Sequence, residues 1–241
     1  MLNKDAVLKQ VQAAIERNTH VDRLGSPIGL TFHDGTVMLV GEVPHIAVKK
    51  LALKAAAGVS GVRAVSDHLR VGAGPATGDG ATRQAVCESL LQAVDFRNCA
   101  VQAWTKGQRD VLRDAAGSDA SGAIDVAVAD GVVTLSGWVI SLSHKRLAGV
   151  LTWWARGCRD VVNALEVAPA EEDNDDEIVE ALHLVLETDP SLRAERIGIA
   201  SHDRVVTLEG VVASEGEKYR AEMDAWYLFA VDGVINRLEV R

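Results

Sequence analysis

The stretch DGVVTLSGWV at residues 130–139 decides how this chain is organised, because it occurs three times. Residues 34–43 read DGTVMLVGEV, and residues 203–212 read DRVVTLEGVV. The second copy lies 96 residues after the first and the third lies 73 residues after the second, and both separations hold without a gap to the end of each copy. Each copy closes on a valine at the same offset: Val71, Val167 and Val240. Such fixed separations indicate a duplicated unit, which we call a repeat.

The residues around each copy predict the same order of elements. Apolar residues at helical spacing within 4–17 predict an amphipathic helix, and the pattern recurs 79 and 171 residues later. An alternating run then leads to Asp-Gly, which predicts a type I′ hairpin turn because both central residues of that turn need positive φ. The third copy has Asp203-Arg204 at this place, which is less typical of the turn. A second helix is predicted over about 45–57, 141–155 and 214–229, and a strand ends each repeat.

These elements predict an α+β fold of three tandem two-layer α/β repeats. Each repeat runs helix, strand, strand, helix, strand, with two helices on one face of a three-stranded mixed sheet. The predicted boundaries are 1–72, 82–168 and 175–241. A Gly-rich segment at 72–80 and an acidic one at 168–177 are predicted linkers. The acidic segment favours the N-terminus of the following helix and is more typical of a solvated linker than of a metal site.

The second repeat differs from the others by an insertion. Its first helix lies 79 residues after that of the first repeat, whereas its strands lie 96 residues after theirs. The difference leaves 17 extra residues within about 100–124. They include Trp104 and end in a Gly- and Ser-rich run. We expect a surface excursion, the usual place of an insertion in a small domain.

Composition and charge limit the class of protein. The chain has 241 residues and a net charge of −9, unevenly distributed: +3 over 1–73, −1 over 79–168 and −11 over 171–241. Attraction to phosphate is therefore expected only from the first repeat. The sequence shows neither a signal peptide pattern nor an apolar run of about 20 residues, so we predict a cytoplasmic protein without a transmembrane segment. The alternative is a periplasmic protein whose native N-terminus was trimmed. Three cysteines without paired spacing predict reduced thiols.

The repeats resemble BON domains, small modules named for bacterial osmotically induced and nodulation-type proteins. The resemblance rests on Asp-Gly-x-Val-x-Leu-x-Gly, an Ala-rich helix, and the closing pattern Gly61-Val62-x-x-Val65-x-Asp67-x-Leu69-x-Val71. The third repeat has Ala230 where this pattern has glycine. The resemblance implies a bacterial protein with a role in stress tolerance, and binding to phospholipid or, in some members, to a cytoplasmic ligand. It supplies no catalytic residues.

The chemistry-bearing residues give no catalytic pattern. The seven histidines form no zinc-ligand spacing, and no P-loop, nucleophile elbow or dinucleotide fingerprint is present. We therefore predict a protein that is not an enzyme and has no cofactor and no metal site. Gly58-Val59-Ser60-Gly61 spells the loop motif of KH domains, but the acidic chain argues against nucleic acid, and a helix-ending glycine is the simpler interpretation.

Two groups of residues are candidate contact sites. The first is a basic helix face of His45, Lys49, Lys50 and Lys54, in which residues four apart form two rows. Its alternatives are an anionic-surface contact and an ordinary solvated helix face. The second group is Trp153-Trp154 and Trp226-Tyr227, which occupy equivalent positions in the second and third repeats. Because adjacent helical residues diverge by about 100°, both rings of a pair cannot easily enter one small core. Contact between these repeats is the favoured interpretation, and core filling or contact with a lipid, ligand or partner remain open.

The sequence thus favours a non-catalytic binding or scaffolding protein, related to stress, whose partner is an anionic phospholipid surface or another protein. The alternative is a cytoplasmic sensor of a small ligand or cation. The oligomeric state does not follow from the sequence.

Overall fold

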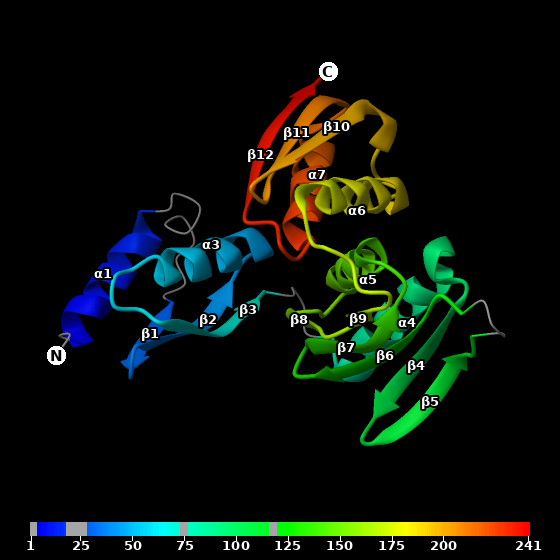
Figure 1. The fold of residues 1–241 in the computed structure, drawn as a ribbon, viewed down its shortest axis with the longest axis horizontal. Helices are drawn as coiled ribbons and strands as arrows, with labels where there is room; N and C mark the ends of the chain where they lie inside the picture. Colours follow the sequence, from blue (N-terminus) through cyan, green and yellow to red (C-terminus); the bar gives the residue numbers. More distant parts are fainter. Residues whose placement is uncertain (1–3, 18–27, 73–76, 116–119) are drawn as a thin grey trace. The chain divides into compact units, whose positions relative to one another are not determined.

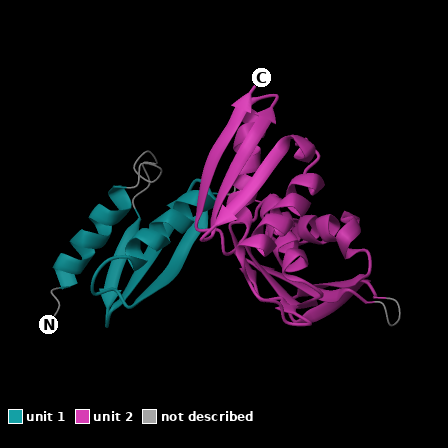
Figure 2. Cartoon of the chain, turned by 45° about the horizontal axis from the view of Figure 1, so that its top comes forward, with its two compact units in different colours: residues 1–72 teal, residues 73–241 magenta. Residues whose placement is uncertain are grey.

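The structure is a computed structural model that describes residues 4–17, 28–72, 77–115 and 120–241. The chain divides into two compact units, Met1–Gly72 and Ala73–Arg241 (Figure 2). The first unit holds the first repeat, and the second unit holds the other two.

The first unit is a two-layer fold. Its three strands form a sheet in the order β1-β2-β3, with β2 antiparallel to β1 and parallel to β3. Figure 1 shows both helices over one face of this sheet. Val7 and Val11 of the first helix are buried against Val37 and Leu39 of the central strand. The elements are α1 (Lys4–Glu16), β1 (Gly29–His33), β2 (Thr36–Val43), α3 (Ile46–Ala57) and β3 (Ala64–Val71).

The third repeat has the same architecture. Its sheet has the order β10-β11-β12, again with an antiparallel and then a parallel pair. The elements are α6 (Asp175–Thr188), the 3-10 turn η3 (Ala194–Arg196), β10 (Ile197–His202), β11 (Val205–Val212), α7 (Glu215–Tyr227) and β12 (Gly233–Val240). The predicted fold class is confirmed in these two repeats.

The second repeat has a larger sheet than predicted. Its strands run β5-β4-β6-β7-β8, and β9 pairs with β7 beyond β8. The expected surface excursion is wrong for residues 99–113, because they form a hairpin whose strand β4 pairs parallel to β6 and buries its first five residues. The elements are α4 (Asp79–Gln92), the 3-10 turn η1 (Val94–Phe96), β4 (Cys99–Thr105), β5 (Gln108–Arg113), β6 (Gly122–Ala129), β7 (Val132–Val139), α5 (Leu142–Trp154), β8 (Asp160–Asn163) and β9 (Glu166–Val167).

The motif that defines the repeats has a structural reason at both ends. The two residues of each hairpin turn have positive φ, including Asp203 at 49° and Arg204 at 62° in the third copy. The glycine at the eighth motif position lies close to the neighbouring strand. A Cβ on Gly137 would be 2.0 Å from the carbonyl oxygen of Ala123, and one on Gly210 would be 2.1 Å from that of Arg196. Another residue there would force the two strands apart.

The second and third repeats share one core. Buried residues of α4, α5 and the six-stranded sheet form a continuous cluster with α6, α7 and the third sheet. Each repeat is too small to bury a large fraction of its surface alone, and joining two cores raises that fraction.

Candidate functional site

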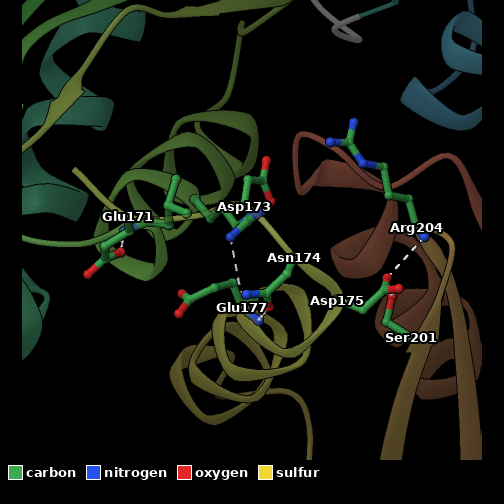
Figure 3. Close-up of polar contacts among 9 residues, drawn as sticks. Glu171, Asp173, Asn174, Asp175, Glu177, Ser201 and Arg204 are labelled. Carbon is green, nitrogen blue, oxygen red and sulfur yellow. Dashed lines mark hydrogen bonds and ion pairs between the residues drawn. The ribbon is translucent and has the colours of Figure 1, made fainter.

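The acidic segment before α6 joins the second repeat to the third. Glu171 Oε2 accepts a hydrogen bond from the backbone N–H of Leu142 at 2.7 Å, at the start of α5. Asp173 Oδ1 accepts one from the guanidinium of Arg146 at 2.5 Å, and the side chain of Arg146 is fully buried. Asn174 caps α6 by accepting from the N–H of Glu177 at 3.0 Å (Figure 3). The prediction of a solvated linker is therefore wrong for this segment, because two of its carboxylates accept hydrogen bonds from α5. We call residues 171–175 the strap.

Asp175 extends the strap to the hairpin of the third repeat. Its carboxylate accepts hydrogen bonds from Ser201 Oγ at 2.5 Å and from the backbone N–H groups of Asp203 and Arg204 at 2.8 and 3.0 Å. Figure 3 shows Asp175 beside Ser201 and Arg204. The Ser201 hydroxyl and these amides hold the pKa of Asp175 below its usual value. Asp79 at the start of α4 binds the two turn amides of the second repeat in the same way, at 3.0 and 2.9 Å.

Three of the four candidate aromatic residues meet between α5 and α7. Trp153 stacks on Tyr227 with ring centroids 5.7 Å apart and planes at 15°. Trp154 Nε1 donates a hydrogen bond to Asp224 Oδ1 at 2.9 Å. Trp226 is also buried, with 4% of its surface exposed. Trp153, Trp154 and Tyr227 thus lie at a contact between the second and third repeats.

A buried pair of carboxylates lies beside these rings. Asp189, at the end of α6, and Asp224 are 1% and 0% exposed. Arg220 Nε donates to Asp189 Oδ2 and lies 3.8 Å from Asp224 Oδ1, while its guanidinium stacks over Trp154. The pKa of Asp224 is raised to about 8, mainly by burial; Arg220 opposes this shift, and the neighbouring charge of Asp189 adds to it. Burial also acts on Asp189, but hydrogen bonds from Ser191 and Arg220 hold its pKa below the usual value.

The interface contains charged residues that the sequence did not single out: Arg146, Asp189, Arg220 and Asp224. Arg146 lies under the ring of Phe229 from the third repeat, 4.8 Å from its centroid. The contacts of Arg220 with Asp189, Trp154 with Asp224 and Arg146 with Phe229 join residues 31, 70 and 83 positions apart. Single charged residues within helices carry no pattern that predicts such partners.

One of the four residues predicted for the basic helix face of the first repeat is buried. Lys49 was expected on this face, but it is only 4% exposed. Its ammonium donates to the carbonyl oxygen of Leu69 at 2.9 Å and forms an ion pair with Asp67 at 2.9 Å. Lys49 therefore stabilises the fold and is not part of an exposed row. His45 and Lys50 are half-buried and Lys54 is exposed, so Lys50 and Lys54 remain a pair one helical turn apart.

In the parts of the chain that the structure describes, no three His, Cys, Asp or Glu side chains are grouped so as to hold a metal ion. No described helix is long and apolar enough to cross a membrane. A groove of about 380 Å³ lies beside α4, and another of about 370 Å³ lies between α6 and η3.

The fold and these contacts define a tandem array of small α/β repeats in which the second and third share a core. Residues 3–73, 105–169 and 174–241 match the family model of the BON domain, and the chain therefore belongs to the BON domain family. The second match begins after α4, although α4 supplies the first helix of that repeat.

Comparison with other proteins adds little to the family match. No curated protein matches the chain. Two structures of CdsD, a structural protein of the type III secretion system of Chlamydia trachomatis, are similar to it. The first, of the C-terminal domain, has 13% identity and a TM-score of 0.25, with all of both chains covered. The second has 14% identity and a TM-score of 0.25, covering 98% of this chain and 92% of the other. Likenesses this weak support no inference about the chain.

Proposed function

We propose that this chain is a non-catalytic, stress-related binding protein whose first repeat docks on an anionic phospholipid surface. The observation that carries the proposal is the division of charge between the two compact units. Residues 1–72 have nine basic and six acidic side chains, a net charge of +3, whereas residues 73–241 have a net charge of −12. An anionic surface attracts the first unit and repels the second.

The helix layer of the first unit supplies the contact. Lys50 and Lys54 lie one turn apart on α3. Lys4 and Lys9 are exposed on α1, the neighbouring helix of the same layer. The opposite charges of Lys49 and Asp67 cancel each other, so this ion pair contributes nothing to the net charge of the unit. A lysine near an anionic membrane contributes about 1 kcal/mol of binding free energy, and several together support a salt-sensitive, reversible association.

Vesicle sedimentation tests the proposal. We expect the full chain to sediment with phosphatidylglycerol vesicles at low salt, to be released as the salt concentration rises, and to ignore phosphatidylcholine vesicles, because exposed charges are screened by salt. Lys54→Glu should weaken binding several-fold. Lys106→Glu is the matched control, since it reverses an exposed charge at the turn of the β4–β5 hairpin.

Two outcomes would reject the lipid surface as the partner. One is equal binding to both kinds of vesicle, and the other is equal binding by the Lys54 and Lys106 variants. If the chain binds no vesicles, the partner is instead another protein or a small ligand. The groove beside α4 is the observation that favours a small ligand.

A further inference from the structure

The inserted hairpin leaves part of its sheet without a covering helix. In the first and third repeats two helices cover three strands, but in the second repeat α4 and α5 face a six-stranded sheet. The α4 helix packs on β4 and β6, and β5 is the outer strand of the sheet (Figure 1). A groove of about 380 Å³ therefore runs between α4 and the helix-side face of β4 and β5.

The lining of this groove changes from polar to apolar along α4. Gly80, Arg83 and Gln84 line the end near the start of the helix. Cys87, Glu88 and Leu91 line the other end, together with Ala103 of β4 and Leu112 of β5. From Arg83 to Leu91 the helix rises about 12 Å at 1.5 Å per residue. The groove is thus mainly apolar, with the cation Arg83 at one end and the exposed carboxylate of Glu88 farther along α4.

The individual side chains fit an occupant of the same polarity. Leu112 is 45% exposed, so part of its apolar surface is available to a ligand. Arg83 is half-buried, whereas Gln84 and Glu88 are exposed, and the amide of Gln84 donates a hydrogen bond to the carboxylate of Glu88 at 2.8 Å. Arg83 is therefore the less exposed of the two charged side chains that line the groove. Burial raises the pKa of the Cys87 thiol to about 11, so the apolar end carries no thiolate charge.

We propose that this groove binds a long-chain aliphatic carboxylate. The alkyl chain lies between Leu91 and Leu112, and the carboxylate forms an ion pair with Arg83. An apolar cavity of this size with one or a few placed polar groups is typical of a ligand site. The site belongs to the second repeat and is independent of the basic helix layer of the first.

Calorimetric titration of the full chain with sodium laurate, kept below its micelle-forming concentration, tests the proposal. We expect saturable binding of one laurate per chain. Leu112→Gln should weaken the affinity at least tenfold by placing a polar group in the chain site, and because Leu112 is partly exposed this variant should still fold. Arg83→Gln should weaken laurate at least tenfold and leave the neutral analogue dodecanol unchanged.

A matched control distinguishes the groove from general attraction to arginine. Arg97→Gln removes an exposed arginine of the same repeat that does not line the groove, so it should leave laurate binding unchanged. The proposal is overturned if laurate does not bind, if it binds without saturation, or if the Leu112 and Arg83 variants bind it as the parent does. Because Lys54 lies outside this groove, Lys54→Glu should still bind laurate even if vesicle binding is lost.

Discussion

Ala230 has a φ of 64°, in the left-handed region that favours glycine. The first and second repeats have Gly61 and Gly157 at the equivalent position, with φ values of 93° and 88°. The third repeat therefore carries strain that the other two avoid, since an L-residue in this region costs roughly 1–2 kcal/mol.

Replacing Ala230 by glycine should relieve this strain. We expect Ala230→Gly to raise the free energy of unfolding by up to about 1 kcal/mol, because the extra entropy of glycine in the unfolded chain offsets part of the gain. Denaturant unfolding of the full chain measures it. The reverse change, Gly157→Ala, should be destabilising, because its Cβ would be 2.3 Å from Thr82 Oγ1. A loss of stability in Ala230→Gly would show that the strain argument is wrong.

A second position differs between the repeats in a way that chemistry explains. Asn163 and Asn236 use their side-chain amides to donate to the carbonyl oxygens of Lys145 and Lys218, at 2.7 and 3.0 Å. The first repeat has Asp67 at this place, and a carboxylate cannot donate a hydrogen bond. In the first repeat the ammonium of Lys49 instead turns toward Asp67 and forms an ion pair with it at 2.9 Å.

This interpretation predicts a coupled pair of substitutions. Lys49→Met should lower the free energy of unfolding by about 1–2 kcal/mol, a value reduced from that of a fully buried pair because Asp67 is 33% exposed. Adding Asp67→Asn should restore most of the loss, because the amide then donates as Asn163 does. Calorimetry of the four members of this double-mutant cycle measures the coupling.

Lys54→Met, at an exposed site on the same helix, should change the stability by less than about 0.5 kcal/mol. If the two substitutions of the pair were additive, Lys49 and Asp67 would not form the unit described.

At the scale of elements, comparison of the repeats predicted the helices, the hairpin turns and a mixed sheet of the three common strands. It could not predict the β4–β5 hairpin, because the insertion has no counterpart elsewhere in the chain. The local sequence signal for this hairpin is the pair Lys106-Gly107. In the structure both residues have positive φ, at 50° and 81°, and they form the two-residue turn between β4 and β5.

The acidic segment shows why composition alone cannot identify a solvated linker. The acidic segment 168–177 is rich in carboxylates, a composition typical of solvated chain. Its role depends on Arg146, a single buried residue 27 positions before Asp173, to which it is hydrogen-bonded. The aromatic pairs could be predicted because they recur in two repeats, whereas Arg146, Arg220 and the two buried carboxylates could not, since each occurs without a repeated pattern.

For the whole molecule, the contact between α5 and α7 links the stability of the second unit to pH. In the folded chain burial raises the pKa of Asp224 to about 8, whereas in the unfolded chain a free aspartate has a pKa of about 3.9. Between these two values the folded state binds more protons than the unfolded state. The free energy of unfolding therefore falls as the pH rises through this window, and this contribution is fully present only below the lower value.

The groups that face Asp224 should make this dependence specific. Trp154 donates to one of its oxygens, Arg220 lies 3.8 Å away, and Asp189 is the second buried carboxylate. When Asp224 is ionised, two buried carboxylates share one arginine, and their repulsion should weaken the contact between the second and third repeats.

Asp224→Asn should remove this part of the pH dependence. The amide has the shape of the protonated carboxyl group, so it can accept from Trp154 and donate toward Asp189. In thermal unfolding of the full chain, we expect the transition of residues 73–241 to lose on the order of 2 kcal/mol between pH 6 and pH 8 in the parent, at about 1.4 kcal/mol per pKa unit, and much less in the variant. Glu215→Gln, at an exposed site on α7, should keep the slope of the parent. Equal slopes in the parent and in Asp224→Asn would mean that this buried carboxylate does not control the contact, and that the pH dependence of the second unit arises elsewhere.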